Sequence, residues 1–441
     1  MKSKYNNRSG RNNLSENEDS KTCWLTLMKE LCLKSFRILF TPKFYDKIWI
    51  NLKMIACGSY HSYSHPNERV IYYDITRSGF EKRTTGVQRV VREIYQELNK
   101  NRVAVQPVVA DLITKKYRAV KWDGINPVQI NSSQEIEIKT GDIFLCLDIA
   151  WYEQILTASV LKRYKNKGCD IYLAVHDVLP IEFENYFPKG TAAIQKLWLN
   201  RYKSFAQFIT FSEDVRKKVS CILGIPLNMS IGLGANFHSE EVGNSVLNQC
   251  RQEKTADRII NFLMVGTIEP RKGHELVLAS FERMMKADSS IPAKLKIIGK
   301  EGWMCKRIIK KIKEISRKHT WLEWDQNCND QKLKQAYLES DVVIIASEGE
   351  GFGLPVIEAM LENKTLIVRD IPVFREIIPK EYLNNVSWFG GSGEEIEALL
   401  LKHINESKIV KVNAGREIGQ VIADRFSWSR CCKDLLEMMR I

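Results

Sequence analysis

Short apolar runs alternate with amphipathic stretches along most of the chain, which predicts strands and helices in alternation. The apolar runs are rich in β-branched residues and nearly free of charge, and we interpret them as strands at residues 70–75, 103–110, 142–148, 169–175, 208–212, 259–265, 294–298, 321–324, 341–346 and 365–370. Between them, apolar positions recur at helical spacing, most clearly over residues 87–98 and 275–284. This alternation predicts an α/β protein with parallel, doubly wound sheets, which bind ligands at the carboxyl ends of their strands.

The length of the chain predicts more than one domain, because a single core rarely serves 441 residues. We predict an N-terminal extension at residues 1–69, a first Rossmann-like domain at 70–238, a polar linker at 239–257, a second Rossmann-like domain at 258–415 and a C-terminal helix at 416–441. Residues 1–20 are polar and are expected to be disordered. Residues 23–56 are basic and amphipathic, which indicates either an interfacial membrane segment or an ordinary helical pair packed on the first domain.

Composition and charge narrow the class of protein. No apolar run reaches about 18 residues, which predicts that no helix spans a membrane, and the polar N-terminus lacks the apolar core of a secretory signal. The 11 cysteines form no C-x-x-C pair and indicate reduced thiols in a cytosol. The net charge of +13 is spread along the chain without a nucleic-acid-binding motif, so we expect no nucleic-acid partner. An anionic membrane surface or a diphosphate-bearing acceptor accounts for the charge, and a solvated surface is the alternative.

The stretch from Ser347 to Met360 carries the clearest chemical signal. It follows a predicted strand and places three glycines in five positions, Gly349, Gly351 and Gly353, before a helix that starts near Pro355. The free N–H groups of that helix form a natural anion site. The carboxylates of Glu350 and Glu358 suit the hydroxyl groups of a sugar or ribose instead. The stretch is therefore expected to bind a molecule with both phosphate and sugar, and a glycine-rich turn with two surface glutamates is the alternative.

Three other places at predicted strand ends carry candidate binding residues. Arg271 and Lys272 follow the strand at 259–265. They combine the planar guanidinium of arginine with the compact ammonium group of lysine, which suits a diphosphate. His176 lies directly beyond the strand at 169–175 and is an active-site candidate. Gly86 stands at a strand-to-helix turn where a ligand could meet a helix N-terminus. Each also has a purely structural interpretation, as solvated basic residues, a structural histidine or a plain turn.

The stretch E-G-F-G-L-P-V-I-E-A-M, with Glu350 and Glu358 in an E-x7-E spacing, resembles the retaining glycosyltransferases of family four. The runs V-G-T-I-E-P-R-K-G-H at 265–274 and T-G-V-Q-R-V-V-R at 85–92 are similar to further motifs of that family. The resemblance covers about residues 70–440 and implies the GT-B fold, in which two Rossmann-like domains face each other across a cleft. It also implies that the second domain binds the donor and that the C-terminal helix crosses back to the first domain.

The resemblance further implies roles for individual residues. Glu350 and His176 are expected to be catalytic, with both near the donor sugar, and Glu358 to hold the ribose hydroxyls. The expected donor-binding residues are Gly86, Arg271, Lys272, Gly299, Glu350, Gly351, Phe352, Gly353, Leu354 and Glu358. No metal and no other cofactor are expected, because Arg271 and Lys272 can neutralise the diphosphate.

The substrates are expected by the same resemblance. GDP-mannose is the expected donor, with a UDP- or dTDP-sugar as the alternative, and the acceptor is a lipid-linked oligosaccharide or a lipopolysaccharide core. Such an enzyme is expected in the cytoplasm, with peripheral contact to the inner face of the membrane. A nucleotide-sugar epimerase and a non-catalytic sugar-nucleotide sensor are the alternatives from other functional classes.

Overall fold

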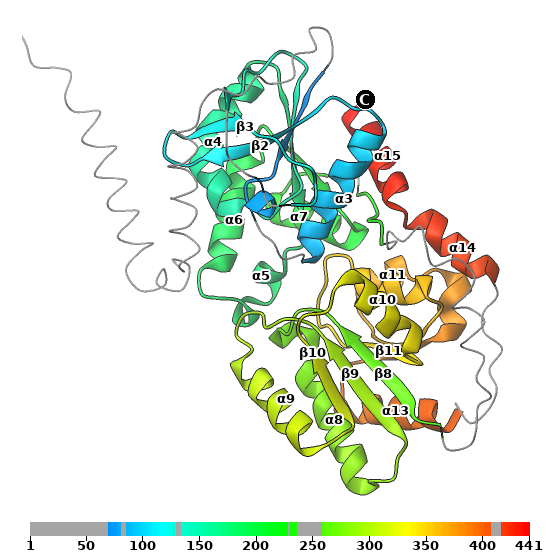
Figure 1. Cartoon of the computed structure of the whole chain (residues 1–441). Helices are drawn as coiled ribbons and strands as arrows, with labels where there is room; N and C mark the ends of the chain where they lie inside the picture. The colour runs from blue at the N-terminus through cyan, green and yellow to red at the C-terminus, as the bar shows by residue number, and fades with distance from the viewer. Residues whose placement is uncertain are drawn as a thin grey trace, which may run out of the picture. The chain divides into compact units, whose positions relative to one another are not determined.

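The computed structural model describes residues 69–80, 85–126, 128, 134–227, 230–235, 258–406 and 416–441. They form two β-sheets, one in the first half of the chain (69–235) and one in the second half (258–406) (Figure 1). The predicted extension at 1–69, apart from its last residue, and the predicted linker at 239–257 lie outside the described residues. None of the described helices combines the length and the apolar content that a bilayer crossing requires.

The first sheet has seven strands in the order β4-β3-β2-β1-β5-β6-β7. They are β1 Ile71–Asp74, β2 Val105–Asp111, β3 Lys116–Ala119, β4 Gln134–Glu135, β5 Ile143–Cys146, β6 Asp170–Val175 and β7 Gln207–Thr210. Five of them run parallel as predicted, and β3 and β4, which were not predicted, extend the edge in antiparallel pairing. The turn into β3 has no glycine. Instead the carboxylate of Asp111 accepts hydrogen bonds from the backbone of Ile113 and Thr114, and Lys115 takes a φ of 53°.

Helices cover both faces of the first sheet. They are α3 Gly86–Lys100, α4 Trp151–Asn166, α5 Leu179–Glu182, α6 Thr191–Tyr202 and α7 Glu213–Leu223, with short 3₁₀ turns η1 Ser78–Phe80 and η2 Glu184–Tyr186. One core joins the sheet to α4, α6 and α7. Helix α3 begins with a capping box, in which the Thr85 side chain accepts from Gln88 N and the Gln88 side chain accepts from Thr85 N at 2.8 Å. Gly86 is therefore the first residue of a helix, at the predicted strand-to-helix turn.

The second sheet is entirely parallel, in the order β10-β9-β8-β11-β12-β13. Its strands are β8 Ile260–Val265, β9 Ala293–Ile298, β10 Leu322–Asp325, β11 Val342–Ile345, β12 Thr365–Arg369 and β13 Val386–Phe389. Its helices are α8 His274–Ala287, α9 Lys306–Lys318, α10 Asp330–Glu339, α11 Leu354–Leu361, α12 Pro372–Ile377 and α13 Gly393–Glu406, with turns η3 Pro270–Lys272 and η4 Lys380–Asn385. One core packs α8, α9 and α13 against the sheet. The strand order reverses direction between β8 and β11, and ligands of doubly wound sheets bind at such a point.

The C-terminal segment contains the helix predicted within residues 416–441, and its last helix begins at the run Phe426-Ser427-Trp428, whose sequence indicates a helix start. It forms two helices, α14 Arg416–Arg425 and α15 Trp428–Met439, because Ser427 interrupts the first and caps the second by accepting a hydrogen bond from Arg430 N at 3.1 Å. Helix α14 packs against α11 of the second half, and α15 packs against α3 of the first (Figure 1). The predicted domain boundaries themselves stay predictions.

Close backbone packing fixes α15 to the first half. Ala235 N donates to Phe426 O at 3.0 Å, and the Cβ that an alanine would add at Gly234 would lie 2.4 Å from Trp428 N. Trp428 is 1% exposed, so it has little room to withdraw. Only glycine therefore fits at position 234.

We expect Gly234→Ala to destabilise the protein by about 1–3 kcal/mol, the usual cost of overpacking a tight contact. The matched control is Gly232→Ala, two residues away, where an added Cβ has nothing within 4 Å. The free energies of unfolding from chemical denaturation compare the two. Equal stability of both variants would contradict the proposed role of Gly234 in docking α15.

Candidate functional site

A buried ion cluster joins the ends of two adjacent strands of the second sheet. Glu350 lies in the glycine-rich loop after β11, whereas Arg271 and Lys272 lie in the turn η3 after β8. The Glu350 carboxylate accepts from Arg271 Nη1 at 3.2 Å and pairs with Lys272 Nζ through its other oxygen. All three side chains are 11–13% exposed. The structure therefore brings together the three charged residues that the sequence assigned to a diphosphate and a sugar.

The charges of this cluster nearly balance one another. Burial by itself would raise the pKa of Glu350, but Lys272 and Arg271 outweigh it and lower that pKa to about 2. Burial raises the pKa of Glu269 and of Asp177, and Arg271 opposes the rise at both. Arg271 also forms an ion pair with Glu269, 3.0 Å between Nη2 and Oε2, and it stays charged because Glu350, Glu269 and Asp177 offset the effect of burial. A diphosphate could replace Glu350 as the partner of the two cations, so that Arg271 and Lys272 would stay paired with negative charge.

A small cavity of about 10 Å³ lies behind the ion cluster. Lys272, Glu350 and His274 line it together with Ser347 and Pro355. His274 is the first residue of α8, and its Nδ1 has no hydrogen-bond partner. Burial, followed by the charge of Lys272, lowers the pKa of His274 to about 3, so the imidazole is neutral. The cavity has the size of about one water molecule.

His176 meets the glycine-rich loop through its backbone. A Cβ at Gly351 would lie 1.9 Å from His176 O, so only glycine permits this approach. The His176 ring turns to Leu147, whose carbonyl oxygen accepts from Nε2 at 2.7 Å. Burial lowers the pKa of His176 and keeps the ring neutral, with Nδ1 as its acceptor. A contact between His176 and a sugar stays a prediction.

The other positions of the glycine-rich loop also lie against the first half. A Cβ at Gly349 would lie 2.6 Å from Leu179 Cδ2 and 2.7 Å from Phe183 Cε2. Ser212, which caps α7, donates its hydroxyl to Gly351 O at 2.7 Å. The glycines at 349 and 351 therefore let the loop pass directly over residues of the first half.

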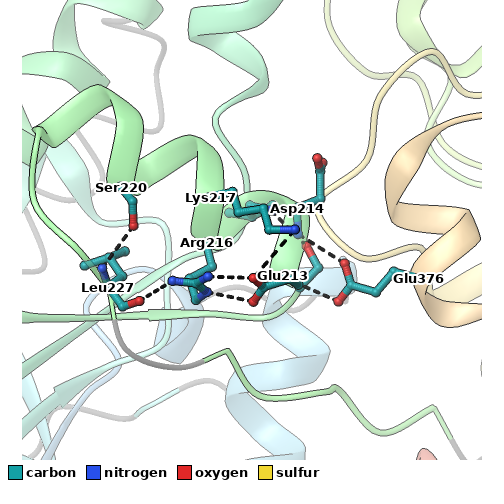
Figure 2. Close-up of polar contacts among 9 residues, drawn as sticks. Glu213, Asp214, Arg216, Lys217, Ser220, Leu227 and Glu376 are labelled. Atoms are coloured by element: carbon teal, nitrogen blue, oxygen red, sulfur yellow. Dashed lines mark hydrogen bonds and ion pairs between the residues drawn. The ribbon is translucent and has the colours of Figure 1, made fainter.

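A carboxylate from the second half reaches the start of α7. Figure 2 shows Glu376, from α12, at the first turn of that helix, where its two oxygens accept from Glu213 N at 2.7 Å and Asp214 N at 3.1 Å. Arg216 holds the Glu213 carboxylate through two hydrogen bonds of 2.6 and 2.7 Å. A carboxylate at a helix N-terminus satisfies free N–H groups and the helix dipole together. This contact joins the two halves at a second place.

Glu358 forms a separate contact between the two halves. Its Oε1 accepts from Arg89 Nη1 of α3 at 2.6 Å, and its Oε2 accepts from the hydroxyl of Tyr337 on α10 at 2.8 Å. Gly86 lies near the start of α11, where a Cβ would be 3.7 Å from Leu354 Cδ1. Sequence reasoning missed Arg89 and Tyr337. The available signal was that Arg89 stands in the T-G-V-Q-R run, three positions after Gly86.

Packing within the protein explains three further candidate residues. A Cβ at Gly299 would lie 1.8 Å from Gly266 O, so the ends of β8 and β9 require glycine there. Gly353 has a φ of +104° and precedes α11, and Phe352 packs its ring 6.2 Å from Phe426. These residues have structural reasons for their identities, and their contacts with a donor stay predictions.

Comparison with known proteins identifies the class of the second half. Residues 249–411 match the family described as "Glycosyl transferases group 1". The chain is 28% identical over 325 residues to the serotype-specific mannosyltransferase WbdA of Escherichia coli, a match that covers 70% of this chain but only 40% of that protein's length. It is also 28% identical over 210 residues to the O-antigen chain mannosyltransferase RfbU of Salmonella typhimurium, covering 47% of this chain and 54% of the other.

The fold also matches solved structures. The Anabaena protein Alr3699/HepE, solved in complex with UDP and glucose, superposes with a TM-score of 0.58 at 12% identity, covering 85% of this chain and all of the other. At this identity the likeness concerns the fold alone. It confirms the predicted GT-B arrangement of two sheets.

The lowered pKa of Glu350 predicts a pH-dependent contribution to stability. Because the pKa is lower in the folded protein than the ordinary 4.5, the contribution is present above about pH 4.5 and is lost as the pH falls toward about 2. The size of the shift corresponds to roughly 3 kcal/mol. We therefore expect the difference in unfolding free energy between wild type and Glu350→Gln to shrink as denaturation is repeated from pH 6 down to pH 3.

The control for this series is Glu437→Gln, which removes a carboxylate whose side chain is 64% exposed. A difference between wild type and Glu350→Gln that stays constant over the whole pH range would contradict the described balance of charges.

Proposed function

We propose that the protein is a glycosyltransferase that moves a hexose from a nucleotide sugar to a saccharide acceptor, because residues 249–411 match the family described as "Glycosyl transferases group 1". The similarity to two O-antigen or serotype-specific mannosyltransferases supports mannose as the sugar and a bacterial surface polysaccharide as the product. GDP-mannose is the proposed donor.

The ion cluster of Arg271, Lys272 and Glu350 carries this proposal. It lies at the carboxyl ends of β8 and β11, where the strand order reverses, and beside the start of α11. A nucleotide sugar presents two phosphates and a set of hydroxyl groups, which match two cations and a carboxylate. In the proposed complex the diphosphate binds Arg271 and Lys272, and Glu350 turns to the hydroxyls of the sugar.

The chemical step breaks the bond between the anomeric carbon and the diphosphate oxygen. Negative charge grows on the leaving diphosphate, where cations and oriented N–H groups lower the barrier. Arg271, Lys272 and the N–H groups at the start of α11 supply these in the proposed mechanism, so we propose transfer without a metal ion. The oxygen of the acceptor hydroxyl forms the new bond to the anomeric carbon, and its proton passes to the leaving diphosphate oxygen. We propose that the anomeric configuration is retained, on the resemblance of the E-x7-E stretch.

The proposed acceptor is a lipid-linked oligosaccharide or a lipopolysaccharide-type glycan at the inner face of the cytoplasmic membrane. The net charge of +13 supports work near an anionic surface. The contacts of the glycine-rich loop with His176 and Ser212 support a reaction in a closed site, from which water is excluded.

The test is a panel of nucleotide sugars, incubated with the protein with and without bacterial membrane extract. We expect GDP-mannose to raise the melting temperature most and the extract to stimulate release of GDP. Glu350→Ala and Arg271→Ala should each lower this stimulated rate by at least about 100-fold, since each removes a group that acts on the charged transition state.

Lys433→Ala, which changes a 77% exposed lysine on α15, serves as the control and should keep full activity. Full activity in both site variants would contradict the site. Conversion of the sugar without an acceptor would indicate an epimerase instead, and binding without turnover would indicate a sensor.

A further inference from the structure

The pair formed by Arg89 and Glu358 has a place in the proposed reaction that the sequence did not indicate. The two residues are 269 positions apart and come from different halves, α3 and α11, yet their charged atoms lie 2.6 Å apart. The Arg89 side chain is 11% exposed and that of Glu358 is 5% exposed. A buried carboxylate needs a nearby cation, because removal from water is costly for an unpaired charge. Arg89 supplies that cation to the residue expected to hold the ribose.

The position of Arg89 on its helix directs it toward the proposed donor. Residues three apart lie on the same face of a helix, so Arg89 shares a face with Gly86. Gly86 in turn lies against Leu354, the first residue of α11. The N–H groups of that helix start are the proposed diphosphate site. Arg89 therefore lies one helical turn from the point where α3 approaches the diphosphate.

The guanidinium of Arg89 has more N–H donors than its ion pair with Glu358 uses. Besides Glu358, Arg89 makes a contact of 3.5 Å between Nη2 and Ala235 O, which is at the outer limit for a hydrogen bond. A guanidinium has five N–H donors in a fixed fork and can hold a carboxylate and a phosphate oxygen together. The carboxylate of Glu358 likewise keeps lone pairs on both oxygens for ribose hydroxyls, next to Arg89 and Tyr337.

We propose that Arg89 is a donor-binding residue of the first half, which Glu358 and Tyr337 orient toward the diphosphate of the bound nucleotide. This rests on the proposed glycosyltransferase function. Glu358 then has two tasks, since it accepts from the ribose and holds Arg89 in place. Donor binding depends on both halves at once, because the second half binds the ribose and the first half adds a third cation to Arg271 and Lys272.

The test measures dissociation constants by calorimetry for GDP, GMP and guanosine, or for the matching series of whichever nucleotide the sugar panel selects. All three ligands carry the same base and ribose and differ only in their phosphates. Arg89→Gln should weaken the binding of GDP by about tenfold or more, the loss expected for one charge-assisted hydrogen bond. It should weaken the binding of guanosine by less than about twofold. The dissociation constant of Arg89→Lys for GDP should lie between those of the wild type and of Arg89→Gln.

A second variant separates binding from folding. Arg89→Gln leaves the Glu358 carboxylate without its cation and is expected to be less stable, whereas the double variant Arg89→Gln with Glu358→Gln removes the charge as well. The double variant should regain thermal stability, yet its preference for GDP over guanosine should stay as low as in Arg89→Gln.

If the wild-type protein binds GDP, two results would contradict the role of Arg89 without contradicting the proposed function. The first is that Arg89→Gln weakens the binding of GDP, GMP and guanosine by the same factor. The second is that the double variant regains the wild-type preference for GDP over guanosine. Either result would mean that Arg89 has a structural role only. If wild type binds no nucleotide of any series, both the proposed function and this inference fail.

Discussion

The burial of three charges in one place is the constraint on which the site depends. Glu350, Arg271 and Lys272 are all nearly covered, and the two cations offset the cost of burying the Glu350 carboxylate. They meet because β8 and β11 are neighbours in the sheet, so the segments that follow these parallel strands lie side by side. The sheet order thus creates both the charge cluster and the place where a ligand of a doubly wound sheet binds. Arg271 and Lys272 carry one positive charge more than Glu350 balances, so the cluster can accept the negative charge of a diphosphate.

The contacts between the halves converge on the same loop and helix. Gly349 and Gly351 allow the loop to pass over Phe183 and His176. Arg89 and Glu358 connect α3 with α11, the helix that directly follows the loop. A ligand bound at the start of α11 would therefore be in contact with residues of both halves. Different segments of the protein would therefore bind different parts of the donor, with the cations contacting its phosphates and the carboxylates contacting its hydroxyl groups.

The local pattern of apolar and polar residues was sufficient to predict most strands and the charged residues that form the ion cluster. Buried parallel strands are apolar runs, and residues just beyond them, such as Arg271 and Glu350, are predicted to meet at one edge. The antiparallel β3 and β4 were missed because β4 has two residues and the turn before β3 relies on Asp111 rather than glycine. The run Phe426-Ser427-Trp428 indicated the start of α15, whereas α14 as a separate helix was not predicted. The contacts of Arg89, Tyr337 and Glu376 could not be predicted, because pairs far apart in the chain leave no trace in periodicity, although Arg89 itself stands in the T-G-V-Q-R run. Gly299 was assigned to a ligand, although contact with Gly266 is enough to require it.

The central claim is that a nucleoside diphosphate binds at the Arg271–Lys272 pair and takes the place of Glu350. A crystal structure of the protein with GDP, or with the nucleotide that binds best, tests this most directly. The account predicts phosphate oxygens within hydrogen-bond distance of Arg271 and Lys272, with the Glu350 carboxylate turned away from both. A diphosphate bound elsewhere, with the pairs between Glu350 and the two cations intact, would contradict it.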